Sequence, residues 1–221
     1  MAGVEAAMKR VFVLGDSISI GFGPFLEQAL RGSMQYDRKS GLHEALQNLD
    51  LPQGANGGDS NACLAYLRGW KDQGGIPADI LVLNCGLHDL KHLRDTRQHQ
   101  VPIETYRDNL LKIIRVVKNM NLKLIWVRTT PVNEIWHQEK KDFDRWEADV
   151  DGYNAAADAI MKLSSVPICD LFTFTRNIPE AMSPDGVHFN ERAQQLQGVF
   201  IAGYLSSYVD ASTTTTESTA V

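Results

Sequence analysis

Short apolar runs that are typical of β-strands alternate with helix-like segments along almost the whole of this 221-residue chain. Two neighbouring parallel strands need a long crossover connection, which is usually a helix, so the alternation predicts a parallel sheet covered by helices on both faces. The expected strands are 11–14, 80–84, 122–127 and 166–168, with a weaker one inside 34–55. The expected helices lie near 24–31, 61–70, 103–120, 150–163 and 191–206.

Right-handed crossovers between such strands give a three-layer α/β/α sandwich. We therefore predict a flavodoxin-like parallel sheet of about five strands, in the order 2-1-3-4-5. Sheets of this kind bind ligands at the carboxyl ends of their strands, so the residues that follow strands are the candidate site residues. Residues 40–49 indicate an additional short helix, and the aromatic-rich segment 133–147 follows a strand.

Composition limits the classes of protein that this chain can belong to. We expect an N-terminal extension (1–9), one folded domain (10–208) and a disordered Ser/Thr-rich tail (209–221). The net charge of −5 disfavours a nucleic-acid partner. No apolar run approaches the roughly 18 residues that span a bilayer, so we expect no membrane partner, and a cytoplasmic location unless a signal peptide was removed. The sequence leaves the oligomeric state open.

A serine stands directly after the first expected strand. The apolar run 11–14 ends in Gly15, Asp16 and Ser17, and a helix-like segment follows. Ser17 would therefore face the ligand crevice from a rigid support, as a nucleophile should. Asp16 or Ser17 could instead cap the next helix, and a nucleophile also needs a base and a group that orients the base.

A loop near the other end of the chain offers both of these groups. Asp185 stands three residues before His188 in a Pro- and Gly-containing segment that precedes the last helix. A turn of this length lets Asp185 accept a hydrogen bond from one ring nitrogen of His188, which leaves the other nitrogen free to act as a base. We predict that Ser17, His188 and Asp185 form a catalytic triad.

These two ends of the chain together resemble the SGNH hydrolases, also called the GDSL esterase/lipase superfamily. In that family the serine lies near the N-terminus and an Asp-x-x-His motif lies near the C-terminus. Residues 56–60 resemble the second block, whose glycine lends a backbone amide to the oxyanion hole, and Gly58 is the best match. Segments 129–132 and 153–157 also resemble segments of this family's members.

The third block departs from the family pattern. Residues 86–89 read Gly-Leu-His-Asp where the family usually has Gly-x-Asn-Asp, so His88 replaces the asparagine that donates to the oxyanion. A neutral imidazole still carries one N–H, and His88 could take over the donor role. It could also turn toward Asp89 and serve structure only, which would leave the oxyanion to the Ser17 and Gly58 amides.

The resemblance implies a serine hydrolase that cleaves carboxylic esters through an acyl-enzyme, most specifically a short-chain or carbohydrate O-acetylesterase. The substrate would be a small-molecule or saccharide ester, and no cofactor or metal is implied. Further residues after strands, or in the aromatic-rich segment, are candidates for the substrate pocket: Asp16, Asp89, Thr130, Trp136 and Val187.

Two other readings stay open. The missing asparagine would fit a non-catalytic carbohydrate-binding relative. A metal-dependent phosphoesterase is the other alternative, with a metal held by Asp16, Asp89, Asp185 and His188, although no close-spaced ligand motif favours this. Cys85 and Cys169 are expected to be small core residues, and several histidines are expected at the surface: His43, His92, His99 and His137.

Overall fold

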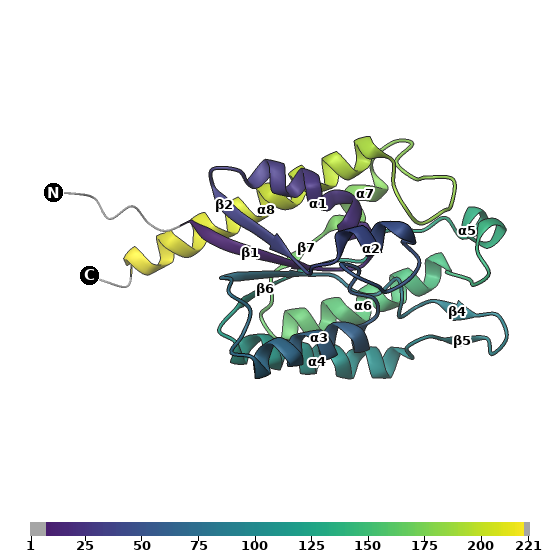
Figure 1. Cartoon of the computed structure of the whole chain (residues 1–221), viewed down its shortest axis with the longest axis horizontal. Helices are drawn as coiled ribbons and strands as arrows, with labels where there is room; N and C mark the ends of the chain where they lie inside the picture. The colour runs from purple at the N-terminus through teal and green to yellow at the C-terminus, as the bar shows by residue number, and fades with distance from the viewer. Residues whose placement is uncertain (1–7, 219–221) are drawn as a thin grey trace.

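A five-stranded parallel sheet forms the centre of the computed structural model, which describes residues 8–218 (Figure 1). The strand order is β2-β1-β3-β6-β7, and every pairing is parallel. Counted along the chain within this sheet, the order is the predicted 2-1-3-4-5. The strands are β1 (Lys9–Leu14), β2 (Met34–Arg38), β3 (Ile80–Leu83), β6 (Lys123–Val127) and β7 (Ile168–Cys169).

Helices cover both faces of this sheet, which confirms the three-layer α/β/α architecture (Figure 1). One layer contains α1 (Ser17–Leu30), α7 (Leu171–Arg176) and α8 (Glu191–Ser218), and α1 packs against α8. The other layer contains α3 (Ser60–Asp72), α4 (Ile103–Asn119) and α6 (Glu147–Leu163). There α4 packs between α3 and α6.

Burial explains which strands the sequence showed clearly. All four residues of β3, and the last four of β1, are buried, because these strands lie inside the sheet under helices on both faces. Such strands appear as continuous apolar runs. The edge strand β2 has only Met34 fully buried, and for this reason its sequence signal is weak.

The carboxyl end of the sheet carries elements that a minimal version of this fold would lack. Helix α2 (Leu42–Gln47) confirms the expected extra short helix, and α5 (Glu134–Lys140) lies in the aromatic-rich segment. A two-stranded antiparallel hairpin, β4 (His92–Leu93) and β5 (Gln98–His99), was not expected. Figure 1 shows the hairpin and α5 projecting at the same end of the molecule.

Two helix boundaries differ from the prediction. Helix α1 already begins at Ser17 and not near Pro24, because Asp16 caps it by accepting a hydrogen bond from Ile18 N. Helix α8 continues beyond residue 206 to Ser218, so the expected disordered tail is corrected up to that residue. A nucleated helix extends at little cost, and Val209 still packs against the core. The rest of the expected tail, 219–221, and residues 1–7 of the expected extension lie outside the described residues.

The three cysteines, Cys63, Cys85 and Cys169, are buried free thiols in the core, which confirms the expectation for Cys85 and Cys169. Within residues 8–218, no helix combines the length and the apolar character needed to cross a bilayer.

Candidate active site

Ser17 is the first residue of α1 and follows a tight turn after β1. A Cβ on Gly15 would lie 2.8 Å from Ser19 Cβ, so this turn requires glycine at position 15. Asp16 Oδ1 accepts a hydrogen bond from Ile18 N at 3.0 Å and thereby fixes the start of the helix. The turn places Ser17 at the carboxyl end of β1, where the backbone N–H groups of the first helical turn have no acceptor within the helix.

A chain of hydrogen bonds joins Ser17, His188 and Asp185. His188 Nε2 lies 2.9 Å from Ser17 Oγ, and His188 Nδ1 lies 2.5 Å from Asp185 Oδ2. Burial alone would raise the pKa of Asp185, but hydrogen bonds from the His188 ring and from the backbone N–H groups of His188 and Val187 lower it. Asp185 is therefore a carboxylate at neutral pH and can orient the imidazole. Residues 171 positions apart in the sequence meet as predicted.

Helix α5 supports the turn that carries Asp185 and His188. Gly186 has a φ of +72°, and its carbonyl oxygen accepts a hydrogen bond from Asn133 N at 2.8 Å. A Cβ at Gly186 would lie 2.5 Å from both Asn133 O and His137 N. Only glycine lets the turn approach the N-terminus of α5 this closely.

Lys141 adds a positive charge beside the same carboxylate. Its Nζ lies 2.6 Å from Asp50 Oδ2 and 3.5 Å from Asp185 Oδ2. The sequence did not point to Lys141, because its partner Asp50 comes from a loop 91 positions away.

The second block contributes glycines whose amides already have acceptors. Gly58 N donates to Asn56 Oδ1 at 2.9 Å, and Gly57 N donates to Gly15 O at 2.8 Å. The Gly57 bond ties this block to the turn before Ser17. Gly58, the expected oxyanion donor, would have to share its N–H between Asn56 and the substrate.

His88 is almost completely buried, with an exposed fraction of 2%. Burial lowers its pKa to about 3, and the positive charges of Arg145 and Lys91 act in the same direction. The ring is therefore neutral at pH 7. In the described part of the chain, His88 Nε2 has no hydrogen-bond partner, so this atom does not turn to Asp89.

Asp89 instead connects the third block to the second. Both of its carboxylate oxygens accept from Ser60 N, at 2.9 and 3.0 Å, at the start of α3. Burial raises the pKa of Asp89 to about 8, although the hydrogen bonds from Ser60 oppose this shift. Asp89 was expected in the substrate pocket, but its contacts place it inside the protein.

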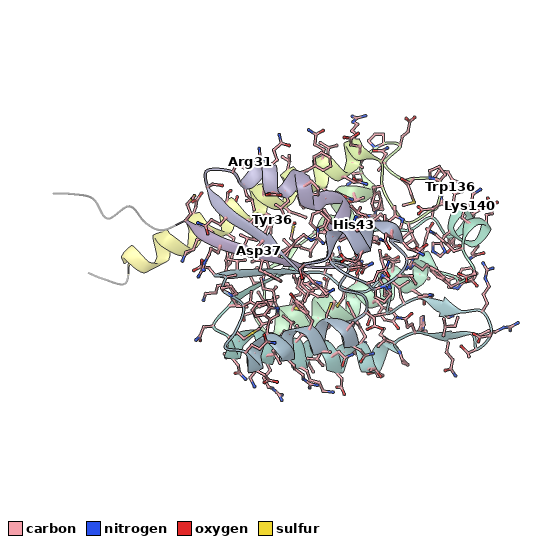
Figure 2. All side chains as sticks on the ribbon, in the orientation of Figure 1. Arg31, Tyr36, Asp37, His43, Trp136 and Lys140 are labelled. Atoms are coloured by element: carbon pink, nitrogen blue, oxygen red, sulfur yellow. The ribbon has the colours of Figure 1, made fainter. Side chains whose placement is uncertain are left out.

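The other expected pocket residues divide in the same way. Asp16, Thr130 and Val187 are buried, whereas Trp136 is 44% exposed. Figure 2 shows Trp136 on α5 near Lys140. Trp136, Val132 and Phe189 line a cavity of about 400 Å³ that contains none of Ser17, Asp185 and His188 but adjoins the turn of His188.

Arg145 is a buried residue of this region that sequence reasoning missed. Its Nε donates to Leu87 O at 2.7 Å, and its Nη1 lies 3.0 Å from His137 Nε2. Burial lowers the pKa of Arg145 to about 10, so the guanidinium remains charged at pH 7. The positive charge of Arg145 lowers the pKa values of Asp16, His88 and His137. The only sequence signal was its place between the aromatic residues Phe143 and Trp146.

His137 corrects the expectation of a surface histidine. It is fully buried between Arg145 and Phe143, and burial lowers its pKa to about 4. The exposed His43, by contrast, lies on α2 as expected (Figure 2).

The carboxylates that a metal-dependent phosphoesterase would use do not converge on one point. Asp16 caps α1, Asp89 accepts from Ser60 N at the start of α3, and Asp185 is hydrogen-bonded to His188. Burial raises the pKa of Asp16 to about 6, against the hydrogen bond from Ile18 and the charges of Arg145 and His188.

Comparisons with known proteins agree with this architecture. Similar solved structures include a lipase/acylhydrolase from Enterococcus faecalis, with 16% identity, a TM-score of 0.68, and coverage of 91% of this chain and 97% of that one. A GDSL-like lipase from Bacteroides thetaiotaomicron has 19% identity, a TM-score of 0.66, and coverage of 90% and 89%. An acetyl xylan esterase, AlAXEase, has 15% identity, a TM-score of 0.63, and coverage of 88% and 98%. At these identities the likeness shows the fold.

Among curated proteins, none matches this chain. The model of one protein family does match, over residues 13–196, which span the segment from β1 into α8 and include Ser17, His88 and His188. The chain therefore belongs to the GDSL-like lipase/acylhydrolase family.

Proposed function

We propose that this protein is a serine hydrolase of carboxylic esters, and specifically a short-chain or carbohydrate O-acetylesterase. Family membership supports an acyl hydrolase. The observation that carries the proposal is the hydrogen-bonded chain from Ser17 Oγ through His188 to Asp185. A serine at a helix N-terminus needs no such chain if it serves only as structure.

In the proposed reaction each of these side chains has its own step. Ser17 Oγ attacks the acyl carbon while His188 Nε2 takes its proton, and His188 then gives this proton to the departing alcohol. Asp185 holds the ring and stabilises its positive charge. A water molecule, deprotonated by the same imidazole, releases the acid from the acyl-enzyme.

Three N–H groups can face the developing negative oxygen in this proposal. The Ser17 amide lies at the positive end of the α1 dipole, His88 offers a ring N–H, and Gly58 offers an amide that it shares with Asn56. His88 is neutral at pH 7, and a neutral imidazole still has one N–H that can donate to the oxyanion.

Two observations favour a small acyl group on a sugar alcohol. One of the similar structures is an acetyl xylan esterase, and the exposed ring of Trp136 lies on the cavity that adjoins the His188 turn. An exposed aromatic ring beside a site is suited to stacking on a sugar.

A panel of p-nitrophenyl esters from acetate to palmitate, together with acetylated xylose, tests the proposal. We expect hydrolysis of the short esters and release of acetate from the sugar. A rate that rises with chain length would instead show a lipase and would overturn the acetylesterase assignment.

Labelling with a fluorophosphonate probe tests the nucleophile separately from substrate choice. Wild-type protein should react quickly, and Ser17→Ala should not react. Ser207→Ala, which changes an exposed serine on α8, is the control and should label like wild type. Absence of labelling in the wild type would show a non-catalytic relative.

A further inference from the structure

A second cluster of polar side chains lies between the β4–β5 hairpin and the first turn of α6. His92 comes from β4, His99 from β5 and Asp149 from α6. The two Nε2 atoms lie 2.9 Å apart. Asp149 Oδ2 lies 3.1 Å from His92 Nε2, and Asp149 Oδ1 lies 3.2 Å from His99 Nε2. The surface histidines expected from the sequence are therefore half-buried members of one group.

Hydrogen bonding alone leaves this cluster poorly matched. Only one proton can lie between two Nε2 atoms, so one ring must point a lone pair at the other. Asp149 brings further lone pairs to the same place, and its Oδ2 atom is buried and accepts no hydrogen bond from any residue that the structure describes. Lone pairs from three side chains thus converge where a cation would stabilise them.

The distances fit a tetrahedral metal ion. Two atoms that bind Zn²⁺ at about 2.0–2.1 Å lie roughly 3.3 Å apart in a tetrahedron. The three contacts of 2.9, 3.1 and 3.2 Å are slightly shorter than this separation, and each carboxylate oxygen of Asp149 lies beside a different ring nitrogen. Two imidazoles and one carboxylate are ligands that Zn²⁺ commonly takes, with a water at the fourth position.

We propose that His92, His99 and Asp149 bind one transition-metal ion, with Zn²⁺ as the best match. The side chains are 22%, 27% and 24% exposed, so the ion has a path from solvent. None of the residues assigned to ester hydrolysis is part of this site, and the proposal does not depend on that function.

The ion would act as a structural clamp. Each strand of the hairpin has only two residues, and such a hairpin is at best marginally stable by itself. The backbone of His92 also pairs with Asp144, through N–H···O contacts of 2.8 and 3.0 Å. A metal bound to Asp149 would therefore fix both the hairpin and the segment that carries Arg145 to α6.

Calorimetric titration of metal-free, tag-free full-length protein with Zn²⁺ tests the site. We expect saturable binding of one ion per chain, and visible absorption typical of tetrahedral Co²⁺ when Co²⁺ is used instead. Loss of a group that merely supports a ligand costs roughly 10- to 100-fold in metal affinity. His92→Ala, His99→Ala and Asp149→Asn each remove or neutralise a ligand, so each should weaken binding by about 100-fold or more.

Matched controls separate the site from general effects on the protein. His43→Ala changes an exposed histidine of α2, and Asp151→Asn changes an exposed carboxylate of α6 two residues beyond Asp149. Both should bind Zn²⁺ like wild type. Zn²⁺ should also raise the unfolding temperature of wild type and both controls but not of the ligand variants. A ligand that binds only the folded state stabilises that state.

Absence of saturable Zn²⁺ binding to the wild type would overturn the proposal. Unchanged affinity in His99→Ala would do the same. If a ligand variant unfolds during purification, the Co²⁺ spectrum of the wild type decides, because a six-oxygen surface site gives only weak absorption.

Discussion

His88 lies where its family usually has asparagine, and its surroundings keep the imidazole neutral. A protonated ring would place a second cation near the buried Arg145 guanidinium and would lose the solvation of the charge. The ring is therefore neutral at pH 7 and, like the asparagine amide, can offer an N–H without adding a buried charge. The Nε2 atom is buried and has no hydrogen-bond partner among the described residues.

We predict that His88→Ala lowers kcat by about 10- to 1000-fold and changes KM little, as expected for an interaction made only in the transition state. His88→Asn should restore much of the loss, because it presents a similar donor. Steady-state kinetics on p-nitrophenyl acetate measures both. Near-wild-type rates for the alanine and asparagine variants alike would show that His88 is structural.

Ser17→Ala and His188→Ala should each lower kcat by more than about 1000-fold while the unfolding temperature changes little, because the proposed mechanism uses both side chains in the reaction and neither in the core. Asp185→Asn should also be severe, since an amide can donate to Nδ1 and so favours the wrong tautomer of His188. Ester turnover and thermal unfolding are the measurements, with Ser207→Ala as the control. Wild-type turnover by Ser17→Ala would exclude the assigned nucleophile.

At the scale of elements, α5 and the hairpin were the parts that the sequence showed least. The strands and helices of the sandwich follow from local apolar patterns, and the place of Ser17 follows from the rule that ligands bind at the carboxyl ends of the strands. His188 follows α7 and not a strand, so its meeting with Ser17 was predicted from the pairing of a serine with an Asp-x-x-His motif. The β4 and β5 strands are too short for any alternation to be visible. The contacts of Arg145 with Leu87 and of His92 with Asp149 join residues more than fifty positions apart, which no local pattern encodes.

Helix α5 contacts the turn that carries Asp185 and His188, so a change at this contact should alter the rate of ester hydrolysis. Gly186→Ala would place a Cβ against Asn133 O and His137 N, and would also strain a positive φ. We expect the turn to move away from α5 and kcat to fall by about 100-fold, because small misplacements of catalytic groups are costly.

The unfolding temperature of Gly186→Ala should fall as well. Gly203→Ala on α8 is the matched control: its Cβ meets nothing within 4 Å, and helical alanine is favoured over glycine. It should therefore keep both activity and stability. Wild-type kcat in Gly186→Ala would show that the turn does not depend on α5.

At the scale of the whole molecule, buried titratable groups make stability depend on pH. His88 has a pKa of about 3 in the folded state and about 6.5 when unfolded, so its contribution is complete above pH 6.5 and is lost as the pH falls toward 3. Asp89, with a pKa raised to about 8, acts in the opposite direction: its contribution is complete below about pH 4 and is lost as the pH rises through 8. Wild type and a His88 variant both contain Asp89, so the difference between their pH-dependent unfolding free energies isolates the contribution of His88.

Between pH 7 and pH 5, wild type should lose about 2 kcal/mol of unfolding free energy that His88→Asn does not lose. Urea unfolding at pH 5, 6 and 7 measures this difference. His43→Asn, at an exposed position, should follow the wild type. Parallel pH curves for wild type and His88→Asn would contradict the buried, neutral state of His88.

Strand β1 begins, and helix α8 ends, at one side of the molecule, while α5 and the β4–β5 hairpin project from the opposite side (Figure 1). Attachment of this protein to a bead, a sensor chip or a fusion partner through the start of β1 or the end of α8 would leave the Ser17 side turned toward the solution. An immobilised preparation should thus admit bulky polymer-linked esters as readily as the protein does when it diffuses freely.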